Sequence, residues 1–124
     1  MITRIDILNH IKEIYDIESV HLWIDSPDTE VLRHKTHKKW FGIIMTVSGD
    51  KVGLDGNTYV DIMNVKCEPE RVFFLSRQPG FAPAYHMNKK HWISIIINGT
   101  APDALVYELI DNSYIMTERA VKRK

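Results

Sequence analysis

Cysteine is almost absent from this chain of 124 residues, since Cys67 is the only one. A single cysteine cannot form a disulfide within the chain, so we expect a reducing compartment, the cytoplasm. No apolar run approaches the roughly 20 residues that a membrane-spanning helix needs. The N-terminus alternates apolar and polar side chains and lacks the apolar core of a signal peptide. We therefore predict a cytoplasmic protein without membrane contact, and we expect a monomer.

Net charge is also absent, because 16 lysines and arginines balance 16 aspartates and glutamates. Neutrality argues against strong unspecific binding to polyanions, but the charges are sorted along the chain. Residues 31–48 and residues 71–100 each contain four basic residues and no acidic residue. A basic face forms if these two segments meet in space. No such face exists if they pair with the acidic segments instead, and the sequence leaves both arrangements open.

Turn and cap signals divide the chain into short helices and strands. A first helix is predicted from Thr3, which begins a capping box with Asp6. Strands are predicted at 30–34, 40–47, 51–54, 59–66 and 92–97, and further helices at 68–75 and from Thr100. The nearly uninterrupted apolar run at 92–97 is typical of a strand that is central in its sheet.

One antiparallel sheet with the N- and C-terminal helices packed on one side is the simplest arrangement for this element order. We therefore predict an α+β fold, with a single domain over residues 1–124. The basic residues at 118–124 are expected to form a frayed tail.

Patterns that indicate catalysis or metal binding are weak. Cys67 lies between a basic and an acidic neighbour, which act on its thiol in opposite senses, so it is interpreted as a small buried residue. Ser94 lies inside an apolar strand, where a hydrogen-bonded core hydroxyl is expected. The histidine pairs at 34–37 and 86–91 lack the thiolates or carboxylates of zinc sites, and nearby lysines oppose a cation. We predict no enzyme, no cofactor and no metal.

The two basic segments mix cations with aromatic and hydrogen-bonding side chains, a combination typical of nucleic-acid contacts. The candidate phosphate-binding cations are Arg33, Lys35, Lys38, Lys39, Lys89 and Lys90, and their candidate hydrogen-bonding neighbours are His86, Asn88 and His91. Trp40 and Trp92 each open a predicted strand, and we expect both to pack in the core because of their large apolar area.

Three segments, in this order, resemble the MmcQ/YjbR family: Arg33–Phe41, Asn64–Pro69 and Pro83–Trp92. The third continues toward Tyr114, so that the resemblance spans nearly the whole chain. It implies an α-β-α sandwich-like domain with the CyaY/frataxin fold. It also implies a DNA-binding group with a double-wing motif, whose members are largely uncharacterised.

From these features we predict a non-enzymatic protein that binds DNA, with a duplex as ligand, through a basic face that contacts phosphates. The alternative is an adaptor that binds a protein or a small molecule in a pocket beside the sheet. That alternative predicts a concave apolar site near Tyr85 or Trp92, and no coherent positive surface. Metal binding of the frataxin kind is a weaker third hypothesis, because Arg4 and Lys12 interrupt the acidic residues of the first helix.

Overall fold

The computed structural model describes residues 1–118 and contains five strands and three α-helices. The elements in chain order are α1 (Arg4–Tyr15), β1 (Glu30–Arg33), β2 (Trp40–Ser48), the 3₁₀ helix η1 (Gly49–Val52), β3 (Tyr59–Lys66), α2 (Pro69–Leu75), β4 (Phe81–Pro83), β5 (Trp92–Ile96) and α3 (Asp103–Glu118). The predicted α+β class is confirmed. Of the predicted frayed tail, Glu118 ends α3, and residues 119–124 lie outside the described residues.

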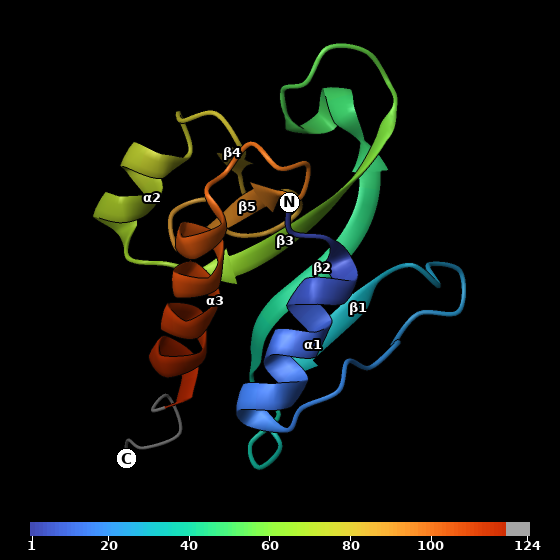
Figure 1. Ribbon diagram of the computed structural model, residues 1–124, viewed down its shortest axis with the longest axis vertical. Coiled ribbons are helices and arrows are strands. Elements are labelled where there is room, and N and C mark those ends of the chain that lie inside the picture. Colours follow the sequence, from blue (N-terminus) through green and yellow to red (C-terminus); the bar gives the residue numbers. More distant parts are fainter. Residues whose placement is uncertain (119–124) are drawn as a thin grey trace.

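The strands form one antiparallel sheet in the order β1-β2-β3-β5-β4 (Figure 1). β3 is therefore the middle strand, and β5 lies between β3 and β4, as its apolar sequence predicts. The edge strand β4 was not predicted, because three residues are too few to show an alternating pattern.

The predicted strand at 51–54 is wrong, because this segment starts within η1. Two backbone hydrogen bonds close the segment into a compact turn: the Gly49 N–H donates to the Thr58 carbonyl at 2.9 Å, and the Leu54 N–H donates to the Gly49 carbonyl at 3.0 Å. Gly53 completes the turn with a φ of 86°, which favours glycine. The turn places Val52 and Leu54 against the sheet.

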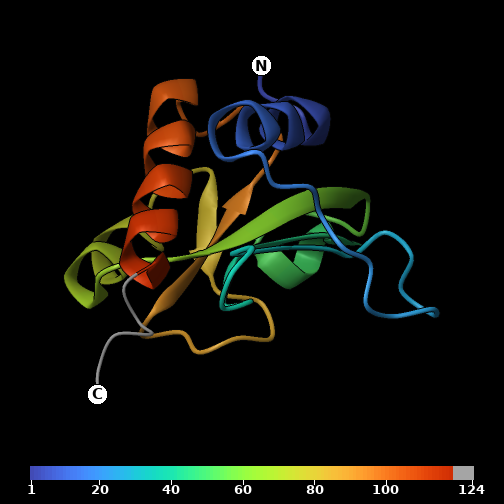
Figure 2. The same ribbon diagram turned by 90° about the horizontal axis from the view of Figure 1, so that it is seen from below.

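Helices α1 and α3 lie on the same face of the sheet (Figure 2). The start of α1 is the predicted capping box: the Thr3 hydroxyl accepts from the Asp6 N–H, and the Asp6 carboxylate accepts from the Thr3 N–H at 2.9 Å. Helix α2 starts with Pro69, where the missing N–H costs no intrahelical bond. Both observations confirm helix starts that were predicted from local sequence.

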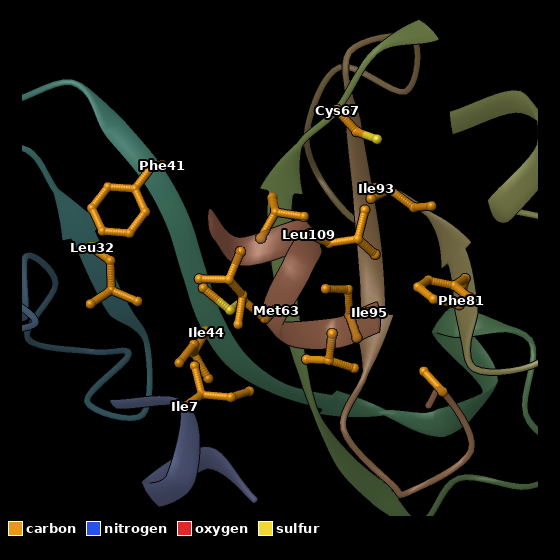
Figure 3. Packing of buried hydrophobic residues seen from close by; sticks show 14 of the residues in the cluster. Ile7, Leu32, Phe41, Ile44, Met63, Cys67, Phe81, Ile93, Ile95 and Leu109 are labelled. Atoms are coloured by element: carbon orange, nitrogen blue, oxygen red, sulfur yellow. The ribbon is translucent and has the colours of Figure 1, made fainter. Parts of the chain in front are cut away.

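The main core fills the space between the sheet and these helices (Figure 3). The strands contribute apolar side chains from the face that α1 and α3 cover. These side chains pack with Ile7 and Ile11 of α1 and with Leu109 and Ile110 of α3. These four helix side chains are fully buried, and burial of each contributes about 2 kcal/mol.

The opposite face of the sheet, called the open face below, carries a smaller apolar cluster. Its buried members are Val47, Val52, Ile62, Ala82 and Ile96. The 3₁₀ helix η1 and the loop between β4 and β5 extend over this face in Figure 2, and neither α1 nor α3 covers it. The open face is therefore the part of the sheet that is left available for a ligand.

Gly80 precedes β4 and has a φ of 92°. A Cβ at this position would lie 2.7 Å from the backbone nitrogen of Ala101. We expect Gly80→Ala to lower the free energy of unfolding by about 2–3 kcal/mol, because left-handed backbone strain adds to the clash. Urea denaturation measures this change. Gly56→Ala is the control, since φ there is 79° but no atom lies within 4 Å, and it should cost only about 1–2 kcal/mol.

Candidate nucleic-acid interface

Two loops from the acid-free segments emerge at the same end of the sheet. Residues 34–39 lead into β2 and residues 84–91 lead into β5, and both strands pair with the last part of β3. Val65 of β3 is paired with Gly42 on one side and with Ile93 on the other. Because neighbouring strands are spaced by about 4.8 Å, the starts of β2 and β5 lie about 10 Å apart.

Lys35 is the one predicted phosphate-binding cation that the structure pairs with an acid within residues 1–118. Its ammonium lies 2.9 Å from a carboxylate oxygen of Asp16 at the end of α1. Hydrogen bonds from Lys35 and Lys12 lower the pKa of Asp16 to about 2. Lys35 therefore points toward the helix side of the molecule, and its charge is already paired with that of Asp16.

The other five cations form no ion pair in the part of the chain that the structure describes. They are Arg33, Lys38, Lys39, Lys89 and Lys90, and we call them the basic loop surface. The four lysines are exposed, and Arg33 is half-buried. An unpaired set of cations at one end of the sheet is the arrangement that a polyanion would recognise.

The three predicted hydrogen-bonding neighbours occupy different places in the loop. The Asn88 side-chain oxygen accepts the N–H groups of Lys90 at 2.8 Å and His91 at 3.0 Å, which holds the turn that carries the lysines. His91 is exposed, and its carbonyl accepts from the Cys67 N–H at 2.9 Å. His86 is exposed and stacks on Tyr85, with ring centroids 3.9 Å apart.

A buried hydrogen-bond network anchors the loop at 84–91 to the open face. The Asn64 amide donates to the Tyr85 carbonyl at 2.9 Å, and the Tyr85 N–H donates to the Ser94 hydroxyl at 3.0 Å. That hydroxyl donates in turn to the Asn64 side-chain oxygen. Asn64 and Ser94 are fully buried. The predicted core hydroxyl of Ser94 is confirmed, while the role of Asn64 was missed, although a polar amide in an otherwise apolar part of β3 was its signal.

The residues considered for catalysis or metal binding have structural environments. Burial and the neighbouring Glu68 carboxylate raise the pKa of the Cys67 thiol to about 11, and its side chain is fully buried, as predicted. His34 is buried, hydrogen-bonds Thr117 at 2.8 Å and has a pKa lowered by burial. Within residues 1–118, no group of three or more histidines, cysteines, aspartates or glutamates is placed to hold a metal ion.

The prediction that Trp40 and Trp92 pack in the core is wrong, because both are half-buried and neither belongs to an apolar cluster. Each stands at the first position of its strand, where the sheet ends. Trp40 is the cross-strand partner of Arg33, and such partners lie on the same face of a sheet. Trp40 also meets Trp23 edge to face, with ring centroids 6.0 Å apart. The part played by Trp23 was not predicted from the sequence.

The open face carries a groove with two hollows, which share Lys51, Tyr85 and His86 among their lining residues. The first hollow has a volume of about 730 Å³ and lies over β4, between η1 and the segment that follows α2. The second has a volume of about 620 Å³ and lies over β2. The adaptor alternative expected a concave apolar site near Tyr85 or Trp92 and no coherent positive surface. The groove supplies a hollow near Tyr85, but its charged lining residues, Lys51, Arg77 and Lys89, are all basic.

The structure thus defines a small α+β domain with one antiparallel sheet, helices on one face and a groove on the other. A family model described as YjbR matches residues 13–116, and the chain belongs to the YjbR family. It is 43% identical over 118 residues to the protein YyaQ of Bacillus subtilis (strain 168), a match that covers 95% of this chain and 100% of that protein. It is 36% identical over 53 residues to YjbR of Escherichia coli (strain K12), covering 42% of this chain and 45% of that protein.

Solved structures share the fold of this chain. The crystal structure of a Pseudomonas syringae protein matches with a TM-score of 0.90 and 35% identity, covering 94% of this chain and 99% of that one. Protein DR2400 of Deinococcus radiodurans matches with a TM-score of 0.75 over 98% of this chain and 83% of that one, and at 24% identity it shows the fold alone. Both curated relatives are named as uncharacterized proteins, so they bring a family and no activity.

No helix within residues 1–118 is both long enough and apolar enough to cross a membrane.

Proposed function

We propose that this protein binds DNA without catalysing a reaction, and that the basic loop surface contacts the phosphates. One observation carries the proposal: two segments without acidic residues, far apart in sequence, emerge at the same end of the sheet. The five cations that they contribute have no carboxylate partner within residues 1–118. The cytoplasm remains the proposed compartment, on the basis of the single cysteine.

Phosphate binding by this surface follows from its electrostatics. A lysine or arginine that binds a DNA phosphate releases a condensed counterion, so that affinity falls as salt is added. Five such contacts predict that the logarithm of the binding constant falls with the logarithm of salt concentration at a slope of about −4.5. The neutral total charge of the chain predicts weak binding away from this surface, because the remaining acids repel the polyanion.

Fluorescence anisotropy of a labelled DNA duplex, titrated between about 50 and 200 mM salt, tests the proposal. We expect the wild-type slope given above. The double variant Lys38→Gln/Lys39→Gln should reduce the magnitude of the slope by about 2, since each lost phosphate contact removes about one counterion.

Lys35→Gln is the matched control, because it removes the same charge from the same loop but at a side chain that Asp16 already binds. We expect its slope to equal that of the wild type. A wild type whose affinity does not depend on salt would overturn the proposal. So would a Lys35→Gln variant that weakens binding as much as the loss of Lys38 and Lys39.

A further inference from the structure

Among residues 1–118, no acidic side chain lines the open-face groove. Its charged lining residues are Lys51, Arg77 and Lys89, with Lys51 in both hollows. None of the three forms an ion pair with another residue in the range 1–118. The chain as a whole contains as many acids as bases. The lining is therefore locally cationic, and it favours a ligand with negative charge.

Arg77 is held in place by groups that carry no formal charge. Its guanidinium carbon lies 3.9 Å from the centroid of the Phe73 ring, and its Nη1 donates to the Phe73 carbonyl at 2.6 Å. A guanidinium that is positioned in this way loses little conformational freedom when it binds a phosphate oxygen. Arg77 and Lys89 also line a third hollow together with Phe73 and Lys90, which connects the groove to the basic loop surface.

Flat rings form much of the remaining lining. Trp23 and Trp40 line the second hollow, and their rings meet edge to face with centroids 6.0 Å apart. The stacked rings of Tyr85 and His86, tilted by only 13°, line both hollows. Such surfaces bind nucleobases of any kind, because every base offers a flat face for stacking.

We propose that the open-face groove binds single-stranded DNA, with an unpaired base in each hollow and the phosphates on Lys51, Arg77 and Lys89. This inference rests on the proposed function, because it takes the basic loop surface as the neighbouring phosphate site and narrows the ligand from a duplex to an unpaired strand. A combination of cations and flat rings in one groove is the pattern by which proteins bind single strands without sequence preference.

Two competing ligands fit the groove less well. A duplex keeps its bases stacked and paired, so it would leave both apolar hollows unfilled and would use only the surface lysines. A single mononucleotide would fill one hollow, whereas the lining continues across the Tyr85–His86 pair and toward Lys89 and Lys90. The lining residues that neighbouring hollows share favour a strand over either competitor.

Anisotropy titrations with a labelled thymidine oligonucleotide of about 12 nucleotides and with the matching duplex test the inference. We expect the single strand to bind at least about tenfold more tightly than the duplex, because loss or gain of a base stack changes affinity by about that factor. Trp23→Ala should weaken binding of the strand about tenfold and leave duplex binding unchanged, because Trp23 lines the second hollow. Phe74→Ala is the matched control, because Phe74 is 61% exposed and lines none of the hollows described above.

Tryptophan fluorescence supplies a second readout that a change in folding does not imitate. Trp23 and Trp40 line the groove, whereas Trp92 does not. We expect the strand to quench fluorescence in the wild type and in Trp92→Phe, and to quench it much less in Trp23→Phe.

The outcomes separate this inference from the proposed function. If the duplex binds as tightly as the strand and Trp23→Ala binds like the wild type, the groove inference fails, while salt-dependent duplex binding still supports the proposed function. If neither form of DNA binds, both fail. Thymidine monophosphate that binds as tightly as the strand would also overturn the inference, because the hollow would then be a site for a small ligand.

Discussion

Replacement of Arg4 by methionine should lower the free energy of unfolding at neutral pH by about 3 kcal/mol. Arg4 in the first turn of α1 bonds each of the first three strands: Glu30 of β1 at 2.8 Å, Thr46 of β2 at 3.1 Å and Asp61 of β3 at 3.1 Å. Its side chain is only 17% exposed, and that of Glu30 only 13%. Methionine keeps most of the aliphatic volume but leaves two poorly solvated carboxylates without a cation, which accounts for the size of the loss.

The difference in free energy of unfolding between Arg4→Met and the wild type should shrink as the pH falls. Burial alone would raise the pKa of Glu30 and of Asp61. Hydrogen bonds outweigh burial and hold both pKa values below the ordinary range. Ser19 and Arg4 donate to Glu30, and Arg4 and Thr46 donate to Asp61. Their contribution to stability is complete above the pKa of the unfolded chain, about 4, and is lost as the pH falls through the lower folded pKa. Wild type and Arg4→Met should therefore converge in acid.

Urea denaturation followed by circular dichroism, at neutral pH and in steps toward about pH 3, measures both effects. Lys12→Met is the matched control, because it removes a cation from the same helix whose partners Asp16 and Glu18 are exposed. We expect it to change stability little. The role given to Arg4 would be contradicted if Arg4→Met were as stable as the wild type. It would also be contradicted if the difference in free energy of unfolding grew as the pH fell.

Features that depend on neighbouring residues could be predicted from the sequence. The capping box at Thr3 and the proline at the start of α2 are both local, and both are present in the structure. The apolar run at 92–97 correctly indicated a central strand, because a strand with partners on both sides has little use for polar residues. The same local reasoning failed at 51–54, where the distant backbone of Thr58 closes a turn that no short pattern shows.

The candidate site was less predictable, since it depends on contacts between distant segments. Lys35 and Lys38 are equivalent in sequence, yet only Lys35 reaches Asp16, which lies 19 positions earlier in the chain. The groove joins Trp23, which precedes β1, to η1 and to Tyr85, and only the strand order brings them together. From the sequence alone, Arg4 is expected to be a solvated helix residue. In the structure, the sheet places Glu30 and Asp61 beside it.

Asn64→Leu should lower the free energy of unfolding by about 3 kcal/mol, because it leaves two buried polar groups without their partners, the Tyr85 carbonyl and the Ser94 hydroxyl. Leucine has a similar volume, so packing changes little, and the loss reports on the hydrogen bonds. Since these bonds hold the start of the loop at 84–91, the variant should also lose binding at the groove, which Tyr85 and His86 line. Urea denaturation and strand binding measure the two consequences.

Asn57→Leu is the control for Asn64→Leu, because Asn57 is exposed and the same substitution there removes no buried hydrogen bond. Asn64→Asp discriminates further: an aspartate still accepts from the Ser94 hydroxyl but cannot donate to the Tyr85 carbonyl, and it adds a charge in a fully buried position. We therefore expect Asn64→Asp to be less stable than Asn64→Leu at neutral pH. The reverse order, or a stable Asn64→Leu protein that keeps full binding to the strand, would mean that the loop is positioned by something other than this network.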